Sequence, residues 1–194
     1  MESLSRKSKR NSKAVSRNFH SNGKYNLNPV DDFQIFAGFS CCSPDDDDKD
    51  LDDFIQNDAE RHRKDLMAVT YGLFLIGYPD HPLAFATLQN DALKIDLANY
   101  RYKSSPAVKI GRLGVSAEWQ GGGIGTELLT MVKNFMLTDN RTGCKYITVD
   151  AYNKPRVLRF YQKSGFSFLK TPNPQRKQEL MYFDLLSHVP QDRV

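Results

Sequence analysis

The alternation of apolar and polar residues is clearest in the second half of the chain. Ala107–Ser116 alternates with a period of two, with Val108 and Ile110 on one face, and this predicts a strand. Gly123–Leu137 repeats its apolar residues at the 3.6-residue spacing of a helix. Tyr146–Tyr152 is rich in β-branched and aromatic residues, which is typical of a strand. Strand, helix and strand in this order predict a βαβ crossover.

A second helix is predicted directly after that crossover. Pro155 suits the first turn of a helix, and Gly165 suits the position just beyond its end. The apolar and aromatic residues of this helix are Val157, Leu158, Phe160 and Tyr161.

The apolar register of the first of these strands slips partway along it. Leu113 and Val115 fall on the opposite parity from the two apolar residues before them. A period of two slips only where one extra residue is inserted, so we predict a β-bulge within Arg112 to Gly114. Gly111 and Gly114 are the residues that would permit it. Such a bulge is either a backbone ligand for an extended molecule or a strained strand without function.

The rest of the chain supplies the other expected elements. The acidic run Asp45 to Asp48 precedes a helix face traced from Leu51 to Leu66, and these carboxylates suit a helix N-terminus better than a metal site. The remaining predicted elements are a strand Tyr25–Val30, a short helix Asp31–Phe39, hairpin strands Thr70–Ile76 and Leu83–Leu88, a polar loop Asn99–Pro106 and a final strand Leu180–Leu186.

Length and composition fit one globular domain with a tail. The chain has 194 residues, of which 40% are apolar and 26% charged, which is enough for a single core. Seven of the 27 Lys/Arg residues but one of the 23 Asp/Glu residues lie in the first 24 positions, so the net charge of +4 comes from this segment. We therefore predict a disordered basic extension over 1–23 and a single domain over 24–194. The extension is either a solvated tail or a contact for nucleic acid phosphates.

Cysteine usage and hydropathy bear on where the protein works. Cys41, Cys42 and Cys144 lack metal-ligand spacing and are interpreted as reduced thiols, so no metal site is predicted. No stretch is apolar enough to cross a membrane, and the N-terminus lacks the apolar segment of a signal peptide. We expect a cytoplasmic protein without a membrane partner.

The loop between the first strand and the first helix carries the strongest functional signal. Trp119–Thr126 holds four glycines in five residues, at 121, 122, 123 and 125. Glycine accepts positive φ angles and lets backbone N–H groups approach a phosphate closely. The position before a helix favours an anion there. The loop is therefore predicted to be an anion cradle.

The loop lacks the features of two common nucleotide sites. A triphosphate loop needs a lysine after its last glycine, but Thr126 and Glu127 follow here. The dinucleotide pattern G-x-G-x-x-G fails at Thr126 or at Leu128, depending on where it starts. The pyrophosphate of coenzyme A remains as a ligand, and a plain strand-to-helix turn remains as the alternative.

Two motifs in this region resemble the GNAT superfamily of acyl-CoA-dependent N-acetyltransferases. The loop pattern of the family, Gln or Arg followed by x-x-Gly-x-Gly/Ala, is matched by Gln120, Gly123 and Gly125. Its Phe-Tyr-x-x-x-Gly-Phe pattern is matched by residues 160–166. Both motifs occur in the order and at the spacing of the family, and the resemblance covers roughly residues 24–186.

The resemblance implies a fold and a place for the acetyl donor. The fold is α/β (α+β): a mixed, mostly antiparallel sheet of about six to seven strands with a bulge and splayed central strands, flanked by about four helices. Acetyl-CoA, the donor, would lie in the gap between the splayed strands, its pantetheine arm bound to the backbone at Leu113 and Val115. The residues that match the pyrophosphate loop are Gln120 at its entrance and Gly121, Gly122, Gly123, Ile124, Gly125 and Thr126.

The resemblance also assigns roles to two side chains. Asn153 matches a position whose side chain often binds the pantetheine, although a polar residue near a helix start is the alternative. Tyr161 matches the residue that protonates the departing CoA thiolate in many members. Reference pKa values of about 10 for a phenol and 8.5 for a thiol allow this transfer without large retuning. A half-buried structural tyrosine is the alternative.

The implied chemistry is direct attack of a neutral amine on the thioester, with Tyr161 as the general acid. The general base is not assigned. Glu118 and Asp150 are near in sequence, but the first is interpreted as a solvated loop charge and the second as a strand-end carboxylate. An amine with a low pKa needs no strong base.

The acceptor is left open between an unspecified primary amine and the α-amine of aminoacyl-tRNA. The second follows from a resemblance, in residues 51–59 and in the Phe-Tyr motif, to a GNAT branch that includes toxins acting on aminoacyl-tRNA. That branch implies tRNA and an antitoxin as partners. Gly114 and Ser116 depart from the alanine and aspartate usual there. A non-catalytic module that binds acyl-CoA or nucleic acid is the alternative class, and we expect a monomer or homodimer.

Overall fold

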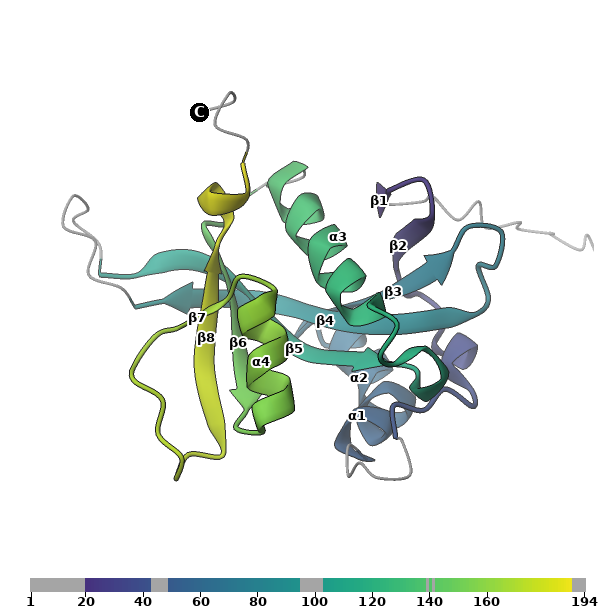
Figure 1. Ribbon diagram of the computed structural model, residues 1–194. Helices are drawn as coiled ribbons and strands as arrows, with labels where there is room; N and C mark the ends of the chain where they lie inside the picture. The colour runs from purple at the N-terminus through teal and green to yellow at the C-terminus, as the bar shows by residue number, and fades with distance from the viewer. Residues whose placement is uncertain (1–19, 43–48, 95–102, 139, 141, 190–194) are drawn as a thin grey trace, which may run out of the picture.

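The computed structural model describes residues 20–42, 49–94, 103–138, 140 and 142–189, which form one mixed sheet with helices on both faces (Figure 1). The strand order in this part of the chain is β1-β2-β3-β4-β5-β6-β8-β7. β5 and β6 pair in parallel, and the other neighbours pair antiparallel. The strands are β1 (His20–Ser21), β2 (Tyr25–Pro29), β3 (Val69–Leu75), β4 (Pro82–Leu93), β5 (Ser105–Val115), β6 (Tyr146–Tyr152), β7 (Ser167–Phe168) and β8 (Gln178–Asp184).

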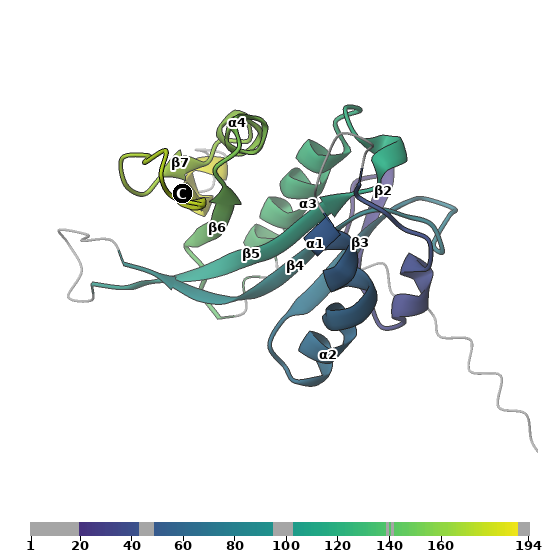
Figure 2. The same cartoon turned by 90° about the horizontal axis from the view of Figure 1, so that it is seen from below.

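The helices divide between the two faces of the sheet. α1 (Lys49–Asp53) and α2 (Ala59–Lys64), joined by a π-helical segment over Phe54–Asp58, lie on one face. α3 (Ile124–Thr138) and α4 (Pro155–Lys163) lie on the other (Figure 2). α3 therefore supplies the crossover between the parallel strands β5 and β6, as the sequence pattern predicts.

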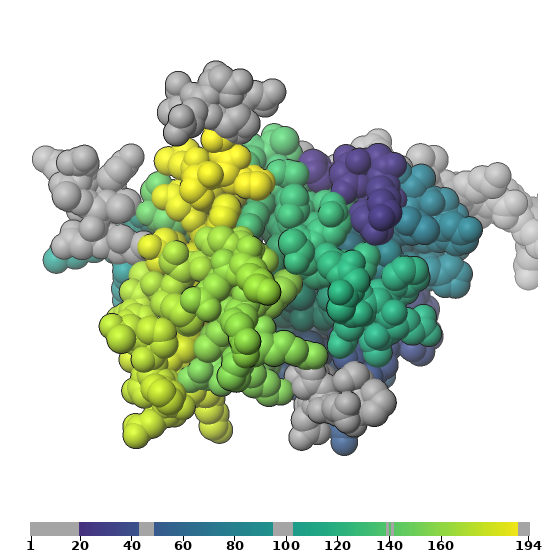
Figure 3. Space-filling view, in the orientation of Figure 1, coloured from purple at the N-terminus to yellow at the C-terminus, as the bar shows by residue number. Residues whose placement is uncertain are grey.

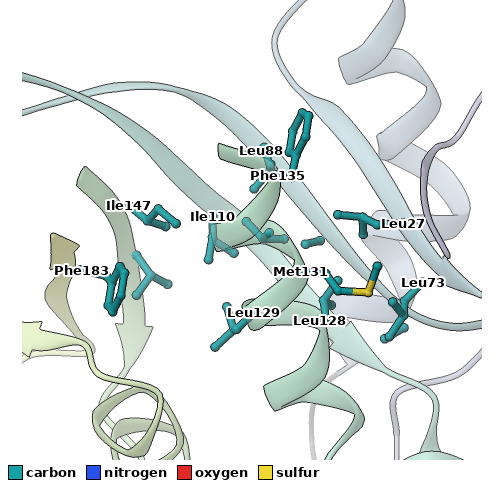
Figure 4. Close-up of a cluster of buried hydrophobic side chains, with 14 of the residues drawn as sticks. Leu27, Leu73, Leu88, Ile110, Leu128, Leu129, Met131, Phe135, Ile147 and Phe183 are labelled. Carbon is teal, nitrogen blue, oxygen red and sulfur yellow. The ribbon is translucent and has the colours of Figure 1, made fainter. Parts of the chain in front are cut away.

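The main core lies between α3 and the sheet because α3 is amphipathic. Leu128, Leu129 and Met131 are buried there against residues from several strands, including Leu27 of β2 and Leu73 of β3 (Figure 4). A second buried cluster fills the other face, under α1 and the π-helical segment; its members are Val30, Phe36, Phe39, Cys41, Phe54, Ile55, Ala59 and Phe85.

The observed elements lie close to the predicted ones, with several differences. The final strand, β8, runs from Gln178 to Asp184 and not to Leu186, because a 3₁₀ helix begins at Leu185. β4 extends to Leu93, beyond the expected end at Leu88, because it pairs with β5 from Ala84 to Leu93. The expected helix Asp31–Phe39 is a single 3₁₀ turn, Phe33–Phe36, which Gly38 follows with a φ of +81°. The two-residue edge strands β1 and β7 bring the described strands to eight.

Some predictions fall on residues outside the described ranges. These are the basic extension up to residue 19, the acidic run at 45–48 and most of the loop at 99–106. Cys41, Cys42 and Cys144 are described and are free thiols. None of the helices in the described segments has the length and apolar character needed to span a membrane.

Candidate active site

The bulge in β5 lies at Gly111. Thr87 of β4 pairs with Arg112, while the next residue, Leu88, pairs with Ile110, so Gly111 is the extra residue. The bulge is thus one residue earlier than the predicted segment Arg112 to Gly114. The register slip in the sequence shows only that one residue is added before Leu113, and glycine is the residue that accommodates the irregular backbone most easily.

β5 and β6 separate immediately after this bulge. They pair in parallel from Ala107 with Tyr146 as far as Ile110 with Val149. β5 then continues to Val115 and β6 to Tyr152 without pairing, which confirms the expected splay (Figure 2). A cavity of about 490 Å³ fills this gap and is lined by both strands, the glycine loop and α4. Figure 3 shows the surface hollowed between the yellow-green α4 and the teal segment that contains the loop.

The exposed end of β5 presents different side chains to the two faces of the sheet. Leu113 and Val115 pack against the core cluster that contains α3. Arg112 points to the opposite face, where its guanidinium carbon lies 5.2 Å from the centre of the Phe54 ring. All three β5 residues line the cavity. The cavity therefore has one wall on the α3–α4 side and one on the α1–α2 side.

The glycine loop requires glycine for two different reasons. Gly121 and Gly123 have φ angles of +75° and +84°, and a Cβ at either position would meet nothing within 4 Å. There the backbone angle, not space, demands glycine. At Gly125 space is the reason, because a Cβ would stand 3.2 Å from the Phe160 ring of α4. The loop and α4 are therefore packed closely side by side.

The loop ends in the N-terminus of α3. The helix begins at Ile124, and the first N–H groups of a helix have no partner within it. Residues 123–126 and Gly121 line the cavity, so this positive end of the helix dipole borders it. Gly122 is not among the lining residues. Unpaired backbone N–H groups at a helix N-terminus are groups that favour an anion.

Gln120 fastens the start of the loop. Its Nε2 donates to the carbonyl oxygen of Cys41 at 2.7 Å and to that of Val115 at 3.2 Å. Both amide hydrogens are thus used within the protein. Gln120 holds the loop against the end of β5 and the segment before α1.

Tyr161 of α4 also lines the cavity. The helix starts at Pro155, and Gly165 follows its end with a φ of +84°. The Tyr161 side chain is 6% exposed and packs against Phe160 and Phe166, with ring centres 5.0 and 5.3 Å away. No described residue accepts a hydrogen bond from its hydroxyl. Burial raises the pKa of Tyr161, so the phenol keeps its proton at neutral pH.

Asn153 lies outside the cavity. Its Nδ2 donates to the carbonyl oxygens of Asn173 and Arg176, each at 2.9 Å. These bonds hold the loop before β8 against the end of β6. The structure therefore does not bring Asn153 together with the loop and Tyr161, because its amide hydrogens already have partners in this loop.

Two cavity features were not assigned from the sequence. Arg112 and Tyr152 line the cavity, and the Tyr152 hydroxyl donates to Asp50 of α1 at 2.6 Å. Asp150 also lines it and forms an ion pair with Lys109 of β5. The alternation of β5 and β6 and the predicted crossover could have placed Lys109 and Asp150 on one face, but their contact depends on the register of the parallel pair, which the sequence does not give. Glu118 is not among the lining residues.

Residues 33–166 match the model of the acetyltransferase (GNAT) family. The match extends over more than half of the chain, so the protein belongs to the GNAT acetyltransferase family. The sequence has no match among curated proteins.

Solved structures with the same fold include KacT and the toxin AtaT. A tyrosine-to-phenylalanine mutant of KacT superposes with a TM-score of 0.70 at 20% identity, covering 84% of this chain and 96% of that chain. AtaT complexed with acetyl-methionyl-tRNAfMet gives 0.68 at 20% identity, over 84% and 96%. AtaTR bound with AcCoA gives 0.65 at 21% identity, over 84% and 95%. At this level of identity the likeness establishes the fold.

Proposed function

We propose that this chain transfers the acetyl group of acetyl-CoA to a primary amine. The observation that carries the proposal is the single cavity that joins the glycine loop, the parted strands and Tyr161. A pyrophosphate would lie on the backbone of 121–126, and the pantetheine arm would run along Leu113 and Val115. Gln120 supports the loop. Asn153 has its amide hydrogens engaged elsewhere and is left out of the proposed donor site.

Tyr161 is the proposed general acid. Its raised pKa keeps the proton on the buried phenol at neutral pH, and no described residue accepts a hydrogen bond from it. As the C–S bond breaks, the developing thiolate would take this proton. We propose that a backbone N–H group freed by the bulge polarises the thioester carbonyl.

The proposed acceptor is the α-amine of aminoacyl-tRNA. The support is the fold shared with KacT and AtaT, one of which was solved with acetyl-methionyl-tRNAfMet. The amine of an aminoacyl ester is unusually acidic for an amine, which suits a site whose general base is not evident. Arg112 and Arg156 line the cavity and would meet phosphates of the acceptor end.

The same likeness supports a second partner. AtaT was also solved bound to the C-terminus of the antitoxin AtaR. We therefore propose an antitoxin for this chain, a cytoplasmic site of action, and one catalytic domain from residue 24 onward with a basic extension before it. A monomer or a homodimer remains the expected assembly.

The test is transfer of labelled acetyl from acetyl-CoA to polyamines, free amino acids, peptides and charged tRNA. We expect label on charged tRNA alone. Label on other amines and not on tRNA would discard the tRNA acceptor and keep the acetyltransferase. No label on any acceptor would overturn the proposed function.

Tyr161→Phe tests the general acid in the same assay. We expect kcat to fall about 10²- to 10⁴-fold, the usual contribution of a positioned acid. Acetyl-CoA affinity by calorimetry should stay the same, since the hydroxyl has no binding role. Tyr182→Phe is the matched control, because Tyr182 packs on Tyr146 outside the cavity. Full activity of Tyr161→Phe would remove Tyr161 from the mechanism.

A further inference from the structure

Asp150 stands at the point where the two central strands part. It is the first residue of β6 beyond the last parallel pair, Ile110 with Val149. The residue that follows Ile110 on β5 is Gly111, which has no side chain to fill the space. Asp150 lines the cavity at this apex.

The carboxylate faces the α1–α2 side of the sheet. Its neighbours Val149 and Ala151 are buried in the cluster that contains α3, so Asp150 alternates to the other face. Arg112 lies on that same face, over Phe54. The Asp150 side chain is 37% exposed, so a ligand in the cavity can reach it.

One oxygen of this carboxylate is in use and the other is available. Oδ2 accepts a hydrogen bond from Nζ of Lys109. Among the described residues, none donates to Oδ1. The Lys109 ammonium thus fixes the carboxylate in one orientation and leaves the lone pairs of Oδ1 for a donor from outside the protein.

Oδ1 of Asp150 belongs to a negatively charged group in a cavity whose other described charged lining residues are positive. Of the described residues that line the cavity, Asp150 is the one acidic side chain, whereas Arg112 and Arg156 are cationic. An amine acceptor presents N–H donors and, while protonated, a positive charge. A carboxylate is the side chain that binds such a group most strongly, by charge-assisted hydrogen bonds.

We propose that Oδ1 of Asp150 binds the amino group of the acceptor and that Lys109 positions Asp150 for this role. The inference rests on the proposed transfer to an amine. The bound ammonium first releases one proton to water. Its nitrogen then bonds to the acetyl carbon, the C–S bond breaks, and the sulfur takes the proton of Tyr161. The nitrogen loses a second proton to solvent, Tyr161 regains one, and Asp150 is unchanged.

The direct test compares binding of two probes that differ only in the amino group. These are methionyl-tRNA and the same tRNA carrying the α-hydroxy analogue of methionine, measured without acetyl-CoA. We expect the wild-type protein to prefer the amine by about 10- to 100-fold, the usual effect of a hydrogen bond to a charged group. In Asp150→Asn the preference should fall to near one, with affinity for the hydroxy probe retained. Lys109→Met should reduce the preference partly.

Asp184→Asn is the matched control. Lys145 and Asp184 form a similar lysine–aspartate pair, with side chains 25% and 34% exposed against 25% and 37% for Lys109 and Asp150. That pair lies at the other end of β6 and β8, away from the cavity. Asp184→Asn should keep the full preference.

Two outcomes would overturn the inference. One is a wild-type protein that binds both probes equally, and the other is an unchanged preference in Asp150→Asn. Neither outcome contradicts the proposed function if the transfer assay still shows labelled acetyl on an amine. Absence of acetyl transfer to any acceptor would instead remove the proposed function and the inference with it.

Discussion

Gly114→Ala places one methyl group where the chain has no room for it. A Cβ at this position would stand 2.5 Å from Sγ of Cys41 and 2.5 Å from Cε1 of Phe85. Both neighbours are buried, at 2% and 0% exposure. Phe85 is in turn held by the rings of Phe36 and Phe39, each 5.8 Å away centre to centre. Since non-bonded carbon atoms prefer about 3.5–4.0 Å, the neighbours must move by about 1 Å.

The expected cost follows from two opposing effects. Forcing an extra methyl group into a packed core typically costs about 1–3 kcal/mol. Replacing glycine by alanine restricts the unfolded chain and returns about 0.4–1 kcal/mol. We therefore expect Gly114→Ala to lower the free energy of unfolding by about 1–2 kcal/mol. Gly111→Ala is the control, because its Cβ would meet the flexible end of Gln89 at 3.2 Å, and its effect should stay within about 0.5 kcal/mol.

Urea unfolding of both variants measures this difference. Any shift of β5 at Gly114 also moves Leu113 and Val115, which line the cavity, so acetyl-CoA affinity by calorimetry should fall in Gly114→Ala. A Gly114→Ala protein with wild-type stability and wild-type acetyl-CoA affinity would refute the reasoning, because it would mean that the second buried cluster accommodates an extra methyl group without a cost in free energy.

Two further substitutions give separate readouts. Gly123→Ala should weaken acetyl-CoA binding about tenfold by calorimetry. A φ of +84° strains alanine by about 1–2 kcal/mol, and the loop must change shape to relieve this strain. Unchanged affinity would show that the loop does not hold the donor. Lys133→Met tests a buried amine whose Nζ donates to the Ser164 carbonyl and whose pKa is lowered by burial to about 8. Between about pH 8 and 10.5 the unfolded chain binds more protons at Lys133, so wild-type stability should rise with pH relative to the variant. Parallel urea curves for both proteins at pH 7, 8.5 and 10 would contradict this.

The sequence predicted the parts of the site that depend on local backbone chemistry. Glycines with positive φ, such as Gly121 and Gly123, leave a direct trace in the sequence because few other residues adopt these angles. The start of α4 at Pro155 is readable for a similar local reason. The register slip predicted a bulge but not its residue, since one added residue gives the same parity change at Gly111 as at Arg112.

Features that depend on contacts between distant segments could not be predicted in this way. Asn153 has a sequence position that suits ligand contact, yet its amide is engaged by the loop at 173–176, twenty residues further on. The approach of Cys41 to Gly114 joins segments that are 73 residues apart in the sequence (114 minus 41). The Lys109–Asp150 pair likewise depends on the register in which β5 and β6 pair.

The parting of β5 and β6 also bears on the kinetics expected for the proposed reaction. In the proposed complex the donor lies on the α3–α4 side and the amine arrives from the side of α1, so the two substrates would approach the thioester carbon from opposite directions. Neither would block the path of the other, and either could bind first. We therefore expect random-order ternary-complex kinetics without an acetyl-enzyme intermediate.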